Sequence, residues 1–461
     1  MNPKIGLLPL YFKFYNNVMP ELMLRIEEFN QNIIKELNQL KINVLAVPIS
    51  CVKEDFLKAI KLFEKNQVDA IVAIHLAYSP SLESAKVLAK TKIPIIILDT
   101  TPNYEFGPDI DPDEIMYNHG IHGVQDLCNV LLREGKDFII EAGHWKKSDV
   151  LKRVLKHIMG ALISRSFRIS RVGSIGGHFK GMGDVYVPSK ILKDTIGIET
   201  IYSYPKDLVE YVPKSRDKIV KMEFEEDLNN FQTGGLKKEA HINTIRAGLA
   251  VRHWIISKNL TSFTINFSAF DKKSGFPTIP FLEASKAMAR GIGYAGEGDI
   301  LTASFVGALL KVFPQTTFAE MFCPDWKGNR IFVSHMGEAN INLIAGKPRL
   351  IEKDLPFLKT NNPVMAMGRF KSGNAILVNL APIRGGDYLL VISEIYMEDV
   401  KGKDKFTETI HGWFQPKISI PEFLMKYSRV GGTHHSAIIY NGDIEIIFSF
   451  GKIMGWNTVV I

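Results

Sequence analysis

The fold of this chain is decided by residues 70–99, which read AIVAIHLAYSPSLESAKVLAKTKIPIIILD. Two largely apolar runs of strand length, Ala70–His75 and Pro94–Asp99, flank Ser81–Ala89, a helical stretch rich in small residues. Strands that are apolar along their whole length need cover on both faces, and the helices of β–α–β units supply it. Residues 70–99 therefore predict a parallel sheet between two layers of helices.

The same alternation extends through the first third of the chain. Further strands are predicted at Ile5–Leu10, Asn43–Pro48 and Phe138–Ala142, and helices at Asn16–Leu40, from Lys53, at Asn118–Leu132 and at Lys146–Phe167. We expect an N-terminal α/β domain with a doubly wound parallel sheet over residues 1–167. No Gly-x-Gly-x-x-Gly follows the first strand, so a dinucleotide site is not supported.

The rest of the chain divides where its pattern changes. A second α/β unit begins near Arg168, with the strand Arg171–Ile175 running into a Gly-rich turn, Gly176–Asp184. Beyond Glu320 the chain reads as strands without long helices between them, which is typical of an antiparallel sheet. We predict a central α/β domain over residues 168–322 and a mostly antiparallel β domain over residues 323–461.

Composition narrows the functional classes. The chain has 46% hydrophobic and 23% charged residues, and its net charge of +7 comes from dispersed Lys and Arg without a basic stripe, which argues against nucleic acid. Three well-separated cysteines argue against a disulfide framework. The first residues enter a strand directly and every apolar run is of strand length, so we expect a cytoplasmic protein that does not bind membranes.

Four residues of the second half could close around one divalent metal ion. They are Glu297 in Gly-Glu-Gly-Asp, Glu320 in Phe-Ala-Glu-Met-Phe, His335 in Ser-His-Met-Gly-Glu and His435 in Gly-Gly-Thr-His-His. Two carboxylates and two imidazoles suit Mn²⁺, Fe²⁺, Co²⁺ or Zn²⁺ better than Ca²⁺. Such a set would leave coordination positions of the ion free for a substrate and would place carboxylate bases beside that substrate, as in an enzyme.

Each of these residues also has a purely structural interpretation. Glu297 is consistent with an exposed turn acid, and Glu320 with a buried acid in a salt bridge to Arg330, which is the better interpretation of that residue alone. A single histidine after a strand, such as His335, is more often structural than a ligand. His434 and His435 are adjacent on a predicted strand, so we expect at most one of them to face a given site.

Two accessory segments are weaker candidates. Residues 118–123, Asn-His-Gly-Ile-His-Gly, begin a helix, where a histidine could bind a polar ligand or cap the helix. The Gly176–Asp184 turn resembles a phosphate loop, but no Gly-Lys-Ser/Thr follows it, and a solvated turn is the preferred interpretation.

Together these segments resemble the L-arabinose isomerase family over most of the chain, most densely from Gly291 to Asn340. The resemblance maps the family's metal-binding glutamates to Glu297 and Glu320. It also maps the family's metal-binding histidines to His335 in Ser-His-Met-Gly-Glu and to His435 in Gly-Gly-Thr-His-His.

The resemblance implies an aldose–ketose isomerase that uses Mn²⁺, or another ion such as Co²⁺ or Fe²⁺, on a pentose or 6-deoxyhexose similar to L-arabinose. Glu297 and Glu320 would be both catalytic residues and metal ligands, acting through an enediol. It implies substrate-binding roles for His434 and for His122, the latter resembling a histidine that the family lends to a neighbouring subunit. It further implies a homo-oligomer based on trimers, as in a hexamer.

The chain departs from the family where sugar hydroxyls would be bound. Met321 replaces the family's acid after the second glutamate, and Cys323-Pro324-Asp325-Trp326 replaces its aromatic run. The first strand ends in Pro9-Leu10-Tyr11 without the family's polar sugar-binding residue. Two alternatives therefore stay open: a sugar-binding or regulatory homologue with altered catalysis, and a metal-dependent hydrolase or epimerase on another polyol.

Overall fold

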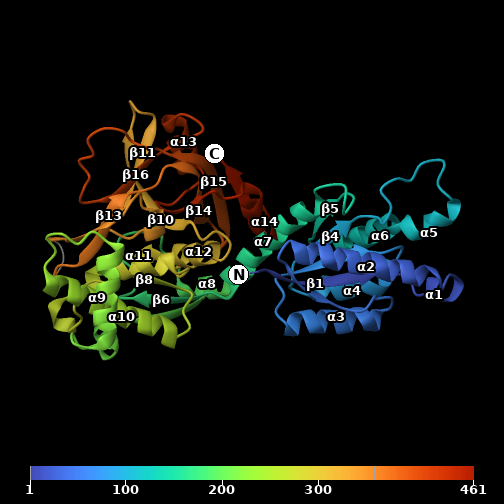
Figure 1. Ribbon diagram of the computed structural model, residues 1–461, viewed down its shortest axis with the longest axis horizontal. Coiled ribbons are helices and arrows are strands. Elements are labelled where there is room, and N and C mark those ends of the chain that lie inside the picture. Colours follow the sequence, from blue (N-terminus) through green and yellow to red (C-terminus); the bar gives the residue numbers. More distant parts are fainter. Residues whose placement is uncertain (1, 357–358) are drawn as a thin grey trace. The chain divides into compact units, whose positions relative to one another are not determined.

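The chain folds into two compact units. The computed structural model (Figure 1) describes residues 2–356 and 359–461. The first unit consists of the residues up to Leu162 together with Glu445–Ile453, and the second of Ile163–Ile444 with Met454–Ile461. The predicted boundary at residue 322 falls inside the second unit, so the three-domain division stays a prediction.

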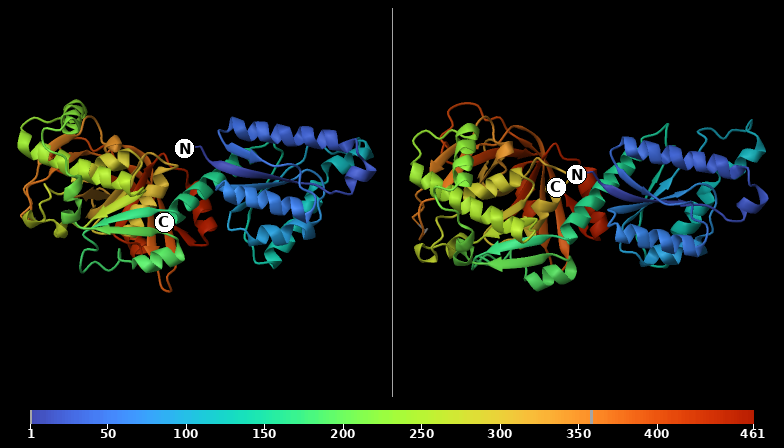
Figure 2. Two further views of the ribbon diagram at one scale, coloured as in Figure 1. Left: turned by 90° about the horizontal axis from the view of Figure 1, so that it is seen from below. Right: turned by 60° about the horizontal axis from the view of Figure 1, so that its bottom comes forward.

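The first unit is built on a five-stranded parallel sheet in the order β2-β1-β3-β4-β5. Its strands are β1 (Lys4–Leu10), β2 (Asn43–Ala46), β3 (Ala70–His75), β4 (Ile95–Asp99) and β5 (Ile139–Ala142). Apolar residues of α2 (Leu22–Gln39) and α7 (Val150–Arg168) pack on one face. The other face packs against α3 (Lys53–Lys65), α4 (Ser81–Lys90) and α6 (Gly120–Arg133), as Figure 2 shows. The predicted doubly wound α/β fold is confirmed.

Most predicted elements of this unit differ from the observed ones only at their ends. One prediction was wrong: the helix expected over Asn16–Leu40 is two helices, α1 (Tyr15–Val18) and α2. The break contains Pro20, which has no backbone N–H to donate and disfavours a helical conformation at Met19. A short helix, α5 (Ile115–Asn118), likewise precedes α6.

The C-terminal helix α14 (Ile444–Met454) supplies the second segment of the first unit. It packs on α7 where Gly160 leaves room: a Cβ atom at Gly160 would lie 2.8 Å from the Cβ of Ser449. The Ser449 hydroxyl bonds the Nδ1 of His157 at 3.0 Å, and the Nε2 of His157 bonds Glu141 at 2.7 Å. Close helix packing and buried hydrogen bonds therefore fasten the distant end of the chain to the first unit.

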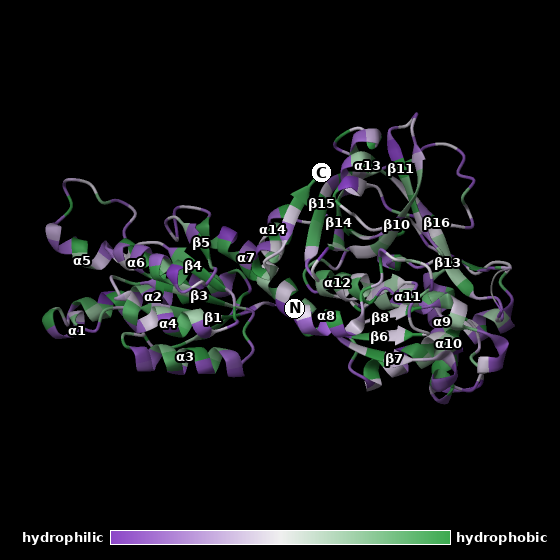
Figure 3. Ribbon diagram, turned by 180° about the vertical axis from the view of Figure 1, so that it is seen from behind, coloured by the Kyte–Doolittle hydropathy of each residue, from purple (hydrophilic) through white to green (hydrophobic). Residues whose placement is uncertain are grey.

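The second unit contains a four-stranded parallel sheet and a larger, mostly antiparallel one. The parallel sheet has the order β7-β6-β8-β9 and comprises β6 (Arg171–Ile175), β7 (Glu199–Ser203), β8 (Ser262–Ile265) and β9 (Gly293–Gly296). Helix α12 (Ile300–Leu310) contacts this sheet on one side and strands of the larger sheet on the other, and all of its residues are buried. Figure 3 shows the corresponding concentration of hydrophobic residues inside the unit.

The larger sheet has the order β12-β13-β16-β11-β10-β17-β14-β15-β18. An additional β16–β15 pairing closes β16, β11, β10, β17, β14 and β15 into a ring, and only the β13–β16 and β15–β18 pairs are parallel. The bounds are β10 (Thr316–Asp325), β11 (Arg330–His335), β12 (Arg349–Glu352), β13 (Val364–Arg369), β14 (Gly373–Pro382), β15 (Tyr388–Met397), β16 (Ile410–Pro416), β17 (His435–Tyr440) and β18 (Asn457–Val460). The predicted C-terminal antiparallel region is confirmed as a barrel-like sheet.

A buried network of charged residues joins the helices on the outside of the second unit. Arg252 of α10 (Lys238–Ser257) bonds both oxygens of Glu223, at 2.9 and 2.8 Å, and both oxygens of Glu283, at 3.2 and 2.9 Å. Lys286 bonds Glu223 at 2.7 Å and also Asp227, which is fully buried. The glutamates and Asp227 belong to α9 (Lys218–Asn230) and α11 (Phe281–Ala289). Charge pairing thus holds α9, α10 and α11 together.

Among the described residues, no helix is both long and apolar enough to cross a membrane.

Candidate metal centre

Glu297 lies in the tight connection between β9 and α12. Its φ of +63° is in the left-handed region, and its neighbour Gly298 has a φ of +83°. Gly296 is also required by packing, because a Cβ atom there would lie 2.8 Å from the Cε1 of His335. The glycines on both sides thus let the backbone bend and let a histidine approach the carboxylate.

Glu320, His335 and His435 come from three neighbouring strands of the larger sheet. In the register, Glu320 of β10 lies opposite His435 of β17 on one side and opposite Ser334 of β11 on the other. His335 follows Ser334 at the end of β11. The ring of Phe318 packs edge-on against both imidazoles, with centroids 4.8 Å from His335 and 4.9 Å from His435. The barrel register therefore brings one acid and two imidazoles together.

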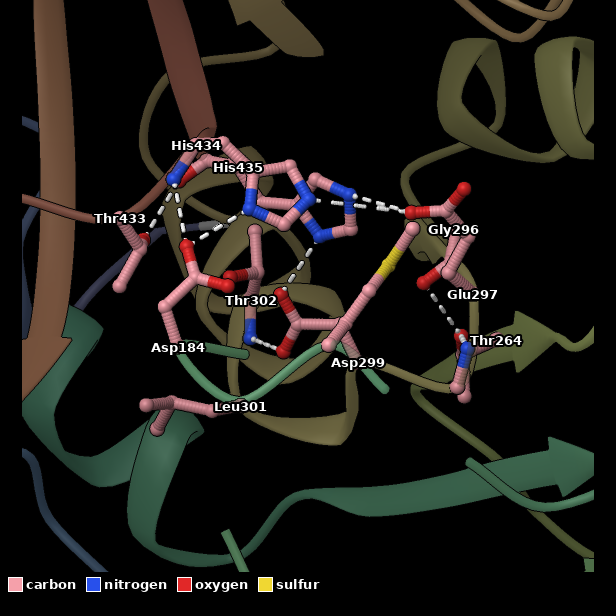
Figure 4. A network of polar contacts seen from close by, with 12 residues as sticks. Asp184, Thr264, Gly296, Glu297, Asp299, Leu301, Thr302, Thr433, His434 and His435 are labelled. Carbon is pink, nitrogen blue, oxygen red and sulfur yellow. Dashed lines mark hydrogen bonds and ion pairs between the residues drawn. The ribbon is translucent and has the colours of Figure 1, made fainter. Parts of the chain in front are cut away.

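Each of these two imidazoles is oriented by a buried carboxylate. The Nδ1 of His435 bonds Asp299 at 2.9 Å, and its Nε2 lies 3.2 Å from Glu297 (Figure 4). The Nδ1 of His335 bonds Glu338 at 2.7 Å, and its Nε2 lies 3.7 Å from Glu320. A carboxylate on one ring nitrogen fixes the direction of the other, which is the usual arrangement around metal-binding histidines.

The donor atoms fit a divalent ion. Oxygen and nitrogen atoms of Glu320, His335 and His435 lie within 4.8 Å of one another, as do those of Glu297, His434 and His435. His435 belongs to both groups, so the two groups meet at its ring. Mixed carboxylate and imidazole donors suit Mn²⁺, Fe²⁺, Co²⁺ or Zn²⁺. The four residues singled out in the sequence therefore lie in two overlapping groups that share His435, and each group could hold such an ion.

His434 also faces this cluster, so the expectation that the two adjacent histidines face apart was wrong. The strand β17 begins at His435, and His434 lies before it, where strand alternation does not apply. Asp184 accepts from the backbone N–H of His434 at 3.0 Å and lies 2.6 Å from its Nδ1 (Figure 4). The Nε2 of His434 is then 3.8 Å from Glu297 and 3.9 Å from Glu320.

The surroundings of the two glutamates shift their pKa values in opposite directions. Burial raises the pKa of Glu297, but the imidazoles of His434 and His435 outweigh burial and hold that pKa well below its usual range. Burial raises the pKa of Glu320 above its usual value. Burial lowers the pKa of His435, but the bonds to Asp299 and Glu297 outweigh it and raise the pKa to about 10. Coordinating imidazoles are neutral, so binding of an ion here would release protons.

The contacts correct two further sequence interpretations and locate a third candidate residue. The salt bridge between Glu320 and Arg330 was wrong, because Arg330 instead pairs with Asp325 at 2.7 Å and Glu398 at 2.8 Å. The Gly176–Asp184 segment is more than a solvated turn, since the Phe179 N–H donates to the Glu297 carbonyl at 3.0 Å and Asp184 holds His434. His122 lies on α6 of the first unit, where its ring contacts that of His119 with centroids 5.9 Å apart.

Sequence reasoning missed the carboxylates that orient the histidines. Asp299 is the N-cap of α12, where it accepts from the Thr302 N–H at 2.9 Å, and nothing in the sequence indicates that it also orients His435. Glu338 has a local signal, because it follows His335 by three residues in Ser-His-Met-Gly-Glu. Asp184 has none, since 250 residues separate it from His434.

Asp299 provides a first prediction. D299N keeps the helix cap, because Asn caps as well as Asp, but it removes the charge from the Nδ1 side of His435. We expect the affinity for Mn²⁺, measured by titration with detection of free Mn²⁺ by electron paramagnetic resonance, to fall about 10- to 100-fold. D271N is a matched control: Asp271 caps a short helical turn through the Ser274 N–H, and it contacts no histidine among the residues that the structure describes. Equal affinity in D299N and wild type would contradict this role.

Partly buried acids and buried imidazoles that gather at one place, each imidazole oriented by a further carboxylate, form the kind of site that enzymes use. Models of the L-arabinose isomerase central and C-terminal domains match residues 193–315 and 315–457, together more than half of the chain. The chain thus belongs to the L-arabinose isomerase family, and it is a sugar isomerase of the aldose–ketose class.

Individual relatives are similar to this chain over most of their own length. An L-arabinose isomerase from Oceanobacillus iheyensis is 24% identical over 413 residues, 86% of this chain and 85% of that protein. An L-arabinose isomerase from Geobacillus stearothermophilus is 24% identical over 469 residues, 96% of this chain and 91% of that protein. Among solved structures, a periplasmic solute-binding protein from Actinobacillus succinogenes with bound D-allose covers 68% of this chain and 92% of that one. Its 12% identity and TM-score of 0.18 support no comparison of site or fold.

Proposed function

We propose that this protein is a metal-dependent aldose–ketose isomerase that acts on a pentose or 6-deoxyhexose similar to L-arabinose by proton transfer through an enediol. The observation that carries the proposal is the convergence of Glu297, Glu320, His335 and His435 from separate segments. The two histidines are each held by a further carboxylate so that their Nε2 atoms face the glutamates. Such a set offers both ion ligands and bases in one place.

The proposed metal ligands are Glu297, Glu320, His335 and His435, and the proposed ion is Mn²⁺ or a similar ion such as Co²⁺ or Fe²⁺. When bound, the ion would supply positive charge beside the O1 and O2 atoms of an open-chain sugar. The contacts support this assignment because each Nδ1 is already engaged by Asp299 or by Glu338, which leaves each Nε2 for an ion.

The proposed chemistry of the chain's own residues is proton transfer. One of Glu297 and Glu320 takes the proton from C2 while O1 gains a proton, which gives a cis-enediol. Delivery of a proton to C1 while O2 loses its proton then gives the ketose, with the other glutamate acting on that side. His434 reaches within 4 Å of both carboxylates, so we propose that it binds a sugar hydroxyl there.

The remaining features of the proposal rest on the resemblance to the L-arabinose isomerase family. We propose that His122 contributes to substrate binding in a neighbouring subunit of a trimer-based homo-oligomer, and that the enzyme works in the cytoplasm. Met321 directly follows Glu320 on β10, so we propose that the replacement of the family's acid at this position alters which sugar the enzyme prefers.

A screen for ketose formation tests the proposal. The purified protein is incubated with aldopentoses and 6-deoxyhexoses in the presence of Mn²⁺, and again after chelation. We expect ketose from at least one sugar, loss of activity after chelation and its return when Mn²⁺ is restored. Tight sugar binding without conversion would instead favour a regulatory homologue, and hydrolysis or epimerisation products without ketose would contradict the isomerase reaction.

A further inference from the structure

The loop between β11 and the short helix Ile341–Leu343 carries Glu338, the carboxylate that orients His335. Glu338 is 1% exposed, and both of its oxygens are engaged. One lies 2.7 Å from the Nδ1 of His335, and the other accepts from the Tyr294 hydroxyl at 2.7 Å. Tyr294 itself is fully buried on β9. The direction of the His335 ring therefore depends on where this loop holds Glu338.

Ser285 of α11 holds that loop on both sides of Glu338. Its hydroxyl donates to the carbonyl of Gly337 at 2.9 Å and accepts from the N–H of Ala339 at 3.2 Å. These two groups belong to the residues directly before and after Glu338. The serine is fully buried, and its hydroxyl is in contact with this loop rather than with water.

Other contacts leave the loop little freedom. Gly337 has a φ of +110°, and a Cβ atom there would lie 2.8 Å from the Cε of Met365. Asn340, which is fully buried, donates its side-chain N–H groups to the carbonyls of Pro314 and Thr316 at 3.2 and 2.9 Å. The loop is thus fixed at its end by Asn340 and in its middle by the Ser285 hydroxyl.

A serine is not what the helix itself favours at this position. Alanine has the higher helix propensity, and a serine inside a helix commonly bonds a carbonyl of its own preceding turn. The two hydrogen bonds of the Ser285 hydroxyl instead reach residues 52 and 54 positions further along the chain. This arrangement favours a role for the hydroxyl outside α11.

We propose that Ser285 is a positioning residue for the metal centre, acting through Glu338 on the direction of His335. The inference rests on the proposed metal-dependent function. The sequence of contacts runs from the Ser285 hydroxyl to the peptides flanking Glu338, then to the Nδ1 of His335. It ends at the Nε2 of His335, which lies 3.7 Å from Glu320. The alignment of this ligand is set by a helix that contributes no ligand of its own.

S285A tests the inference, since it removes both hydrogen bonds and adds no atoms. We expect its Kd for Mn²⁺ to rise about tenfold, as for other groups that orient ligands. The visible absorption of the Co²⁺-loaded protein should also change, because it reports the ligand geometry. S84A is a matched control: Ser84 is a buried helical serine whose hydroxyl donates to the Ser81 carbonyl of its own helix and contacts no metal-centre residue among those described.

A second variant tests whether Ser285 acts on His335 through Glu338. Y294F removes the hydrogen bond to the other oxygen of Glu338, so it should weaken Mn²⁺ binding in the same direction. If both residues act through Glu338, the double variant should lose less affinity than the product of the two single losses. Independent, fully multiplicative losses would overturn the proposed route.

The outcomes separate the two proposals. Failure of the wild-type protein to bind either Mn²⁺ or Co²⁺ would overturn the metal-dependent function. Wild-type binding that S285A leaves unchanged, in both Kd and Co²⁺ spectrum, would overturn the role of Ser285 alone. A spectral change in S285A but not in S84A is the supporting result, because a general loss of stability would not produce it.

Discussion

E320Q and E297Q should each lower the kcat for ketose formation by about 100- to 10,000-fold, the range expected when a positioned proton-transfer group is lost. Gln has nearly the shape of Glu, but its amide neither accepts the C2 proton nor carries the negative charge that a divalent ion prefers. Both carboxylates lie against the imidazoles of the cluster, so the change acts directly at the site. The measurement is the initial rate of ketose formation with saturating Mn²⁺.

E422Q is the matched control for these variants. Glu422 is an exposed residue of α13 (Ile420–Arg429) that pairs with Lys426 at 2.8 Å, and its replacement should leave kcat unchanged. Bound Mn²⁺ per chain, measured in parallel, separates loss of the ion from loss of the base. Full activity of either E320Q or E297Q would refute the proton-transfer mechanism.

R252M should lower the free energy of unfolding by about 3 kcal/mol, because it removes one cationic partner from each of two buried glutamates, which then keep only Lys286 and Arg290. Arg252 bonds two glutamates, of which Glu283 is 3% exposed and Glu223 is 7% exposed. Met fills similar space but neutralises neither of them. Urea unfolding curves of the apo protein at neutral pH measure the change, and R133M, at an exposed position in the last turn of α6, should cost less than about 1 kcal/mol.

The same network predicts a pH dependence. Burial raises the pKa of Glu223, but Arg252 and Lys286 outweigh it and lower the pKa from its ordinary value of 4.5 to about 2. A carboxyl group whose pKa is lowered by folding contributes stability above the unfolded value, and that stability is lost as the pH falls through the folded value. The wild-type advantage over R252M should therefore shrink between about pH 4.5 and pH 2. A stability difference between wild type and R252M that stays constant between these pH values would contradict the role of Arg252 in lowering the pKa of Glu223.

The parts of the fold that could be predicted are those whose cause is local. The runs at Ala70–His75 and Pro94–Asp99 are apolar throughout, so they specify covered parallel strands without further context. Strand β10 was missed, because its second half is exposed and contains Pro324, and no period-two pattern survives there. The sequence also could not show that β10 lies between β11 and β17, which is what brings Glu320 beside the histidines.

The candidate site divides in the same way. Glu297, Glu320, His335 and His435 have recognisable flanking residues and could be selected from sequence. The carboxylates that orient the histidines lie close to them only in the folded chain. Asp184 and His434, for example, are 250 residues apart, so their contact cannot be recognised from sequence spacing. The wrong expectation that His434 and His435 face apart has a related cause. Strand β17 begins at His435 and not at His434, so the alternation of side chains along a strand does not apply to this pair.

The attachment of α14 to α7 has a consequence for the order in which the protein is made. On the ribosome, the sheet of the first unit emerges first, and Ile163–Ile444 of the second unit follows before Glu445–Ile453 appears. The surface of α7 around Gly160 and His157, which Ser449 covers in the folded protein, is therefore uncovered through most of translation. The first unit is completed only after Ile163–Ile444 has been made, so a chain that stalls before Glu445 leaves the first unit without its closing helix.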